Sequence, residues 1–211
     1  MKINRSSISI SLIVLFHAVG LAGFLSPYSN LFLKLVPFHL LLMAVLLVFS
    51  HPDKNKDFWI FIATFYISGF IVEMLGTNTG MIFGKYVYGK TLGLKLAETP
   101  LIIGVNWIIL IYSVGITMRG FRIRSRLKKA LLGALLLVLL DILIEPVAIR
   151  SDYWKWTELE IPFQNYVAWF IFSFLLLCFF YRFNFKKRNP AALAMIVTQF
   201  IFFIILNLTA V

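Results

Sequence analysis

The sequence has a single cysteine, Cys178, so no intrachain disulfide can form. Histidine is also scarce: the three residues include no His-x-x-x-His pair, which argues against a di-iron site of the desaturase type. Acidic residues number 9 against 20 lysines and arginines. Internal repeats and low-complexity segments are absent as well. We therefore expect one domain over residues 1–211, with no metal site and no cofactor.

Apolar residues, in contrast, are abundant and make up 61% of the 211 residues, with 22 phenylalanines. A soluble domain is about half apolar, so composition alone predicts an integral membrane protein. A membrane-spanning helix needs about 20 predominantly apolar residues. Seven runs of about that length predict an all-α protein with seven membrane-spanning helices: Ile8–Leu25, Leu31–Phe49, Phe58–Leu75, Pro100–Met118, Ala130–Ala148, Tyr166–Phe183 and Ala191–Ala210. We interpret the first run as a retained helix, and we expect the chain to leave the fifth helix through Pro146.

The basic residues are unevenly distributed over the loops between these runs. If the amino terminus is cytoplasmic, most of the 20 lysines and arginines lie in the cytoplasm, including the cluster at residues 119–129. Loops rich in Lys and Arg stay in the cytoplasm, so the sequence predicts a cytoplasmic amino terminus and an external carboxyl terminus in a bacterial or archaeal cytoplasmic membrane. Topology explains the net charge of +11, and we expect no nucleic-acid partner. The cluster itself is interpreted as a topology determinant or an anionic-lipid contact.

Three acidic residues, Glu73, Asp141 and Glu145, lie within the predicted membrane-spanning helices. Asp141 and Glu145 are four residues apart and therefore share one helix face. With the orientation above, all three lie in the outer leaflet, Asp141 deepest and Glu145 closer to water. A charged side chain at the centre of a bilayer costs roughly 2.5 to 3.5 kcal/mol, so such residues usually face the bundle interior and serve a function. We expect the three acids to converge on one polar pocket.

Two loops on the acid side are rich in aromatic residues. The first carries Tyr86 and Tyr88 after a series of glycines, and the second carries Trp154 and Trp156. Single Trp and Tyr residues at this depth commonly anchor helices among the lipid headgroups. Their density beside membrane-embedded acids favours instead a pocket with aromatic walls, which stabilise a desolvated cation by roughly 2 kcal/mol.

Four further polar side chains lie in or beside the apolar runs. Asn106 and Asn165 are candidates for orienting a water molecule, although polar contacts between helices would explain them equally well. His17 and His39 are interpreted as packed polar contacts and not as ligands.

A spaced set of residues between positions 73 and 169 carries a family resemblance. Its first part is the pattern E-x-x-G-x-x-x-G-x-x-F-G-x-Y-x-Y, formed by Glu73, Gly76, Gly80, Phe83, Gly84, Tyr86 and Tyr88. The second part consists of Pro100, Leu101, Trp107, Asp141, Pro146, Trp154, Trp156, Pro162, Asn165 and Trp169. This set resembles the integral-membrane carotenoid biosynthesis family, which includes the carotenoid 1,2-hydratases that act on γ-carotene, lycopene or C50 precursors.

The resemblance implies that water is added across the terminal C1=C2 double bond of an acyclic carotenoid ψ end, without a metal or redox cofactor. The residues fit this chemistry by themselves. A strong acid must protonate C2, and a carboxylic acid kept neutral by burial is a suitable donor. A second carboxylate can stabilise the tertiary cation at C1 and take the proton from water. We expect catalytic roles for Asp141, Glu73 and Glu145, and substrate contacts from Tyr86, Tyr88, Asn106, Trp107, Trp154, Trp156, Asn165 and Trp169.

Other functions remain open at this point. A lycopene-type cyclase would form the same cation and capture it with an internal alkene, and a non-enzymatic carotenoid or lipid carrier would use the polar cluster only for binding. A seven-helix retinal receptor is disfavoured because the last run, Ala191–Ala210, has no lysine. The expected partners are a long polyene from the bilayer and membrane lipids, while the oligomeric state is not indicated. For such a substrate we expect an apolar tunnel that opens laterally to lipid, with polar groups only at its closed end.

Overall fold

The computed structural model describes residues 4–158 and 160–209 and contains seven long helices in this part of the chain. All seven are long and apolar enough to cross a membrane, which confirms the seven spans predicted from the sequence. Lys2 and Ala210 lie outside the described residues. The helices are α1 (Arg5–Phe24), α2 (Ser29–Ser50), α3 (Lys56–Thr79), α4 (Ile102–Gly120), α5 (Arg126–Arg150), α6 (Phe163–Phe180) and α7 (Pro190–Leu208).

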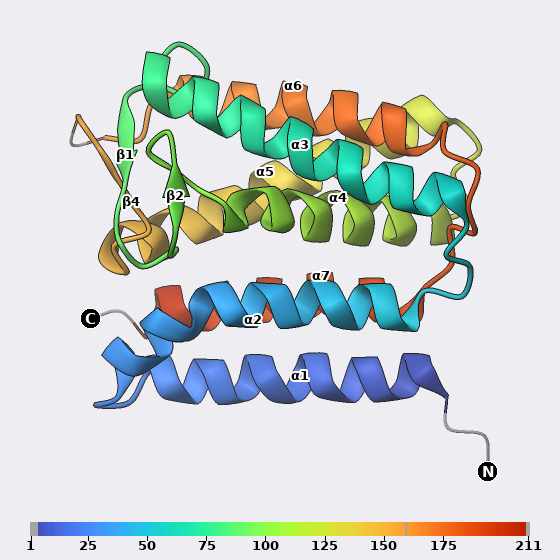
Figure 1. Ribbon diagram of the computed structural model, residues 1–211, viewed down its shortest axis with the longest axis horizontal. Coiled ribbons are helices and arrows are strands. Elements are labelled where there is room, and N and C mark those ends of the chain that lie inside the picture. Colours follow the sequence, from blue (N-terminus) through green and yellow to red (C-terminus); the bar gives the residue numbers. More distant parts are fainter. Residues whose placement is uncertain (1–3, 159, 210–211) are drawn as a thin grey trace.

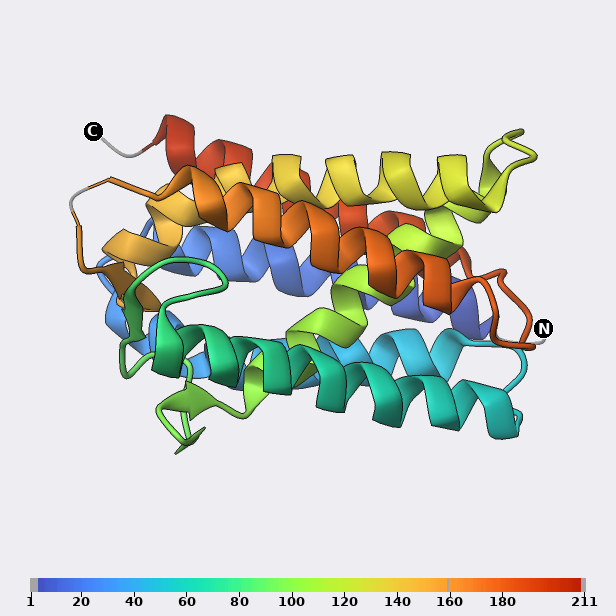
Figure 2. The same ribbon diagram turned by 90° about the horizontal axis from the view of Figure 1, so that it is seen from above.

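The helices run along one common direction and form a bundle around α4 (Figures 1 and 2). Helix α1 lies at one edge against α2 and α7, and α3 and α6 lie at the other edge. Helix α4 contacts α2, α3, α5, α6 and α7, and most of its residues are buried. Small residues permit this close packing: a Cβ on Gly69 of α3 would lie 2.5 Å from the Cβ of Trp107 on α4. Helix α1 begins and α7 ends at opposite ends of the bundle, and the inside-out orientation stays a prediction.

The helix starts follow from their sequences. Asn4, Asn55, Ser125 and Asn189 each accept a hydrogen bond from a backbone N–H of the first turn of α1, α3, α5 and α7. These side chains replace the partners that the first N–H groups of a helix lack. Our expectation for Pro146 was wrong, because α5 continues to Arg150. The helix thereby carries its acids one turn further below its end than the sequence suggested.

Four short strands occupy the loops at one end of the bundle: β1 (Tyr86–Tyr88), β2 (Lys95–Leu96), β3 (Thr99–Pro100) and β4 (Trp154–Trp156). The sequence analysis did not anticipate them. Strand β1, from the α3–α4 loop, pairs with β4, from the α5–α6 loop, as an antiparallel ribbon. Alternate residues of a strand point to the same face, so the two tyrosines and the two tryptophans lie together. The ribbon thus joins two loops that are distant in the sequence.

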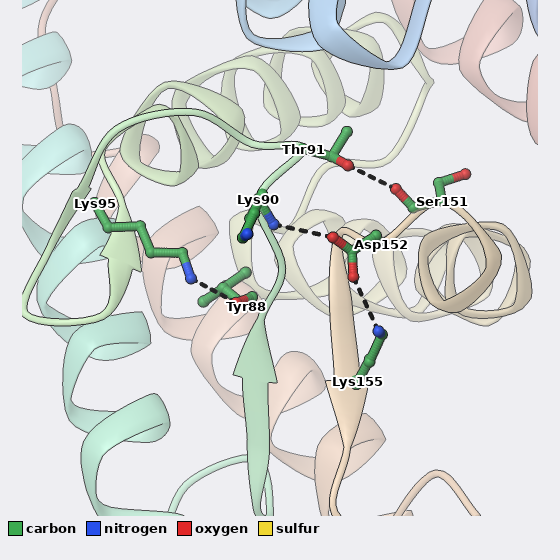
Figure 3. A network of polar contacts seen from close by, with 7 residues as sticks. All are labelled: Tyr88, Lys90, Thr91, Lys95, Ser151, Asp152 and Lys155. Atoms are coloured by element: carbon green, nitrogen blue, oxygen red, sulfur yellow. Dashed lines mark hydrogen bonds and ion pairs between the residues drawn. The ribbon is translucent and has the colours of Figure 1, made fainter. Parts of the chain in front are cut away.

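Polar contacts hold these two loops together beyond the ribbon (Figure 3). Asp152 accepts a hydrogen bond from the backbone N–H of Lys90 at 3.1 Å and forms an ion pair with Lys155 at 3.2 Å. The Thr91 hydroxyl donates to the carbonyl of Ser151 at 2.8 Å. The Lys90 N–H and then the Lys155 ammonium hold the pKa of the Asp152 carboxyl below its usual value. The loops therefore form one cap over this end of the bundle.

Gly84 is the position at which this cap tolerates no side chain. Its φ of +104° is one that residues other than glycine rarely adopt, and a Cβ there would lie 2.7 Å from the Cγ of Pro162. We expect Gly84→Ala to lower the free energy of unfolding by about 1–3 kcal/mol, measured by thermal unfolding in detergent. The matched control is Gly120→Ala, because a Cβ at Gly120 would meet no atom within 4 Å. Equal stability of the two variants would contradict the strain argument.

Candidate functional site

Glu73 is the centre of the first hydrogen-bond cluster under the cap. Its Oε2 accepts hydrogen bonds from the hydroxyls of Tyr86 and Tyr88, each at 2.7 Å. Its Oε1 accepts a third hydrogen bond from the indole N–H of Trp107 at 3.0 Å. Burial, and then the charge of Glu73, raise the pKa of both phenols well above the usual value, so the tyrosines stay protonated donors. Three donors on one carboxyl group stabilise its ionised form.

Glu145 on α5 is the centre of the second cluster. Its Oε2 accepts hydrogen bonds from the indole N–H groups of Trp154 at 3.0 Å and Trp156 at 2.9 Å. Its Oε1 accepts a hydrogen bond from the Asn165 side-chain amide at 3.2 Å. Only 1% of Glu145 is exposed, so our expectation that it lies closer to water was wrong. The cap folds back over the end of α5 and excludes water from this carboxyl group.

Asp141 lies one turn deeper on the same face of α5, and its surroundings differ. Asn165 donates to its Oδ2 at 2.9 Å, so one amide bridges Asp141 and Glu145. The Oδ1 of Asp141 is buried and has no hydrogen-bond partner among the described residues. A buried acceptor without a donor costs about 1–3 kcal/mol. Asp141 is therefore the acid in this site with a free oxygen.

The aromatic ribbon connects the two clusters. Across it, the rings of Tyr86 and Trp156 have centroids 5.2 Å apart, and those of Tyr88 and Trp154 are 6.2 Å apart. The two tyrosines bind the acid of α3, while the two tryptophans bind the acid of α5. A shift of either loop would therefore change the surroundings of both acids.

A cavity of about 490 Å³ is open to all three acids, Glu73, Asp141 and Glu145. From the acids it extends between α1, α2 and α7, where apolar side chains line most of it. Several of these, including Phe16, Leu35 and Phe38, are also exposed on the outer surface. The cavity therefore runs from the acids under the cap to the apolar face of α1 and α2.

Most of the residues predicted for substrate contact line this cavity: Tyr86, Tyr88, Asn106, Trp154, Trp156, Asn165 and Trp169. Trp107 does not line it. It is fully buried behind the site, stacks on Trp169 with ring centroids 4.6 Å apart and holds Glu73 from the protein side. The sequence analysis missed Phe83 and Tyr153, which also line the cavity. The spacing of Phe83 and Gly84 before Tyr86 is the signal that could have included the first of them.

The polar lining is not confined to the closed end, so that part of our expectation was wrong. His17, His39 and Gln199 line the cavity where α1, α2 and α7 meet. The rings of His17 and His39 are 4.8 Å apart, and the Nδ1 of His17 donates to the carbonyl of Ile13 at 2.8 Å. The packed polar contact expected for the histidines is present, although both rings also face the cavity.

Comparison with known proteins gives a family for this chain. The family described as "Carotenoid biosynthesis protein" matches residues 32–211. The bisanhydrobacterioruberin hydratase of Haloarcula japonica is 25% identical to the chain over 131 residues. This match covers 59% of the chain and 44% of the relative, so it spans less than half of that protein. No solved structure matches significantly.

Proposed function

Because the chain belongs to the carotenoid biosynthesis protein family, we propose that it is a hydratase that adds water to the terminal C1=C2 double bond of an acyclic carotenoid ψ end. The observation that carries this proposal is the free oxygen of Asp141, which is buried and unpartnered at a cavity that leads to the apolar face of the bundle. The hydratase among the relatives supports the reaction class.

In the proposed first step, the Asp141 carboxylic acid donates its proton to C2 of the terminal alkene. The π electrons of C1=C2 form the new C–H bond, which leaves a tertiary cation at C1 and a carboxylate at Asp141. Asp141 suits this role because Asn165 is its one hydrogen-bond donor, so little stabilises its ionised form before the reaction. The indole faces of Trp154, Trp156 and Trp169 line the space that the cation would occupy.

In the second step, a water oxygen forms a bond to C1 and its excess proton returns to a carboxylate. Asn165 holds Asp141 and Glu145 together and would orient this water. Glu145 stabilises the cation because its three donors favour the ionised form. Return of the proton to Asp141 restores the enzyme without another reactant. Glu73, which we expected to be catalytic, is assigned instead to positioning the ribbon, because both its oxygens already accept hydrogen bonds.

The shape of the cavity fits entry of a polyene from the bilayer. A volume of about 490 Å³ encloses a drug-sized molecule, so the cavity would hold one end of a carotenoid while the rest stays in lipid. The apolar side chains of α1 and α2 would line the path of entry.

The test is expression of the chain in cells that accumulate lycopene, followed by chromatography and mass spectrometry of the pigments. Hydration adds the mass of one water for each ψ end, and growth in ¹⁸O-water should label the new hydroxyl. A product of unchanged mass with a shortened chromophore would indicate the cyclase. Unaltered lycopene that copurifies with the protein would indicate the carrier, and either result would contradict the proposal.

A further inference from the structure

A second cavity, of about 780 Å³, lies at the end of the bundle opposite the acids, between the α4–α5 loop and the α6–α7 loop. The first loop and the start of α5 contribute the basic side chains Arg119, Arg122, Arg124, Arg126 and Lys129. The second loop adds Arg182 and Lys187. The described lining contains no aspartate or glutamate. Cations from two separate segments of the chain therefore face one enclosed volume.

The protein itself does not neutralise these charges. Among residues 4–158 and 160–209, the recorded ion pair joins Lys155 and Asp152 at the other end of the bundle. Asp57, an acid near the cavity, accepts a hydrogen bond from the backbone N–H of Asn184 at 2.9 Å. Lys129 is only 4% exposed, although a lysine is rarely buried without a partner. A buried cation without an anion indicates that the anion comes from outside the chain.

The electrostatic surroundings of Lys187 agree with this. Burial, and then the positive charges of Arg126 and Arg119, lower the pKa of Lys187 to about 8, while Asp57 opposes the shift. The ammonium lies 4.4 Å from the ring centroid of Phe185, which offers only weak compensation. The cations thus repel each other across the cavity, and an anion between them would relieve the repulsion.

The chemistry of the rim selects among possible anions. Arginine guanidinium groups match the geometry of phosphate oxygens. Phe121 and Leu127, which are 54% and 63% exposed, alternate with the cations along the first loop. Such an apolar edge beside a basic cavity is what a phosphate group attached to acyl chains would contact. We propose that this cavity binds the phosphate group of an anionic membrane lipid. A topology signal would need the same charges, but it would not need them to converge on a cavity or to bury Lys129.

The test measures lipid binding to the full chain in detergent by native mass spectrometry. Phosphatidylglycerol should bind the wild type more tightly than phosphatidylcholine does. Arg122→Gln/Lys129→Met should weaken phosphatidylglycerol binding roughly 30-fold, given the typical contribution of two cations near an anionic surface. The control variant, Lys56→Gln/Lys186→Gln, removes two exposed cations at the same end but outside the cavity and should bind as the wild type does.

Separate arms distinguish the outcomes. If Lys129→Met prevents folding, Arg122→Gln/Arg124→Gln replaces it, because both arginines are exposed. Equal weakening in the cavity and control variants would mean general surface attraction and would overturn the site. Titration with inorganic phosphate tests the soluble source: a phosphate affinity equal to that of the lipid would overturn the assignment to lipid. Lack of preference for phosphatidylglycerol in the wild type would refute the proposal outright.

Discussion

Asp141→Asn should reduce product formation by roughly 10²- to 10⁴-fold, the usual contribution of general acid catalysis, while the protein still inserts and folds. Asparagine keeps the volume and can still accept the hydrogen bond from Asn165, but it has no acidic proton for C2. The measurement is pigment yield per folded protein in cells that supply the acyclic carotenoid. Initial rates in deuterated water should show a proton-transfer isotope effect in the wild type.

The matched control for this variant is Asp152→Asn. Asp152 lies in the cap and binds Lys90 and Lys155, but it does not line the cavity of the acids. The same chemical change there should leave turnover near that of the wild type. Wild-type turnover in Asp141→Asn would remove Asp141 from the mechanism and transfer the acid role to Glu73.

Glu145→Gln is expected to have the second largest effect, with a loss of about 10²-fold in turnover. The carboxylate accepts from three N–H donors, whereas glutamine has one oxygen and an amide NH₂. In either orientation of the amide, at least one of Trp154, Trp156 and Asn165 faces another donor. The variant should therefore also lose about 1–3 kcal/mol of stability, measured by thermal unfolding in detergent.

Glu98→Gln provides the control for this second variant, because Glu98 lies in an exposed turn of the α3–α4 loop and does not line the cavity. It should change neither turnover nor stability. If Glu145→Gln matched it in both measurements, Glu145 would be a solvated group with no part in the site. That result would support the position near water that sequence alone suggested.

The sequence predicted the seven spans because run length and apolar composition are local properties, and the bilayer sets both. The depth of the three acids followed from the same reasoning, through their distance from the helix ends. Their lateral arrangement did not follow, because it depends on which helices pack together around α4. Sequence alone therefore could not separate the free oxygen of Asp141 from the fully bonded oxygens of Glu73 and Glu145.

The burial of Glu145 shows a second limit of sequence reasoning. Its distance from the end of α5 suggested water, but the β1–β4 ribbon covers that end. The patterns Y-x-Y and W-x-W have the two-residue period of a strand with one buried face, so the strands themselves were readable. Their pairing was not, because it joins loops separated by two helices.

The pairing of β1 with β4 also has a consequence for biogenesis. Helix α3 is synthesised long before β4, so Glu73 enters the membrane while the tryptophan half of the ribbon does not yet exist. Tyr86 and Tyr88 follow Glu73 closely in the chain and can bind it soon after synthesis, whereas Asp141 and Glu145 must wait for the α5–α6 loop and for Asn165. Assembly of the cap is therefore a late event, and a chain truncated before residue 154 would insert its first helices but hold α5 with two unshielded acids, a state that membrane quality-control proteases could distinguish from the finished fold.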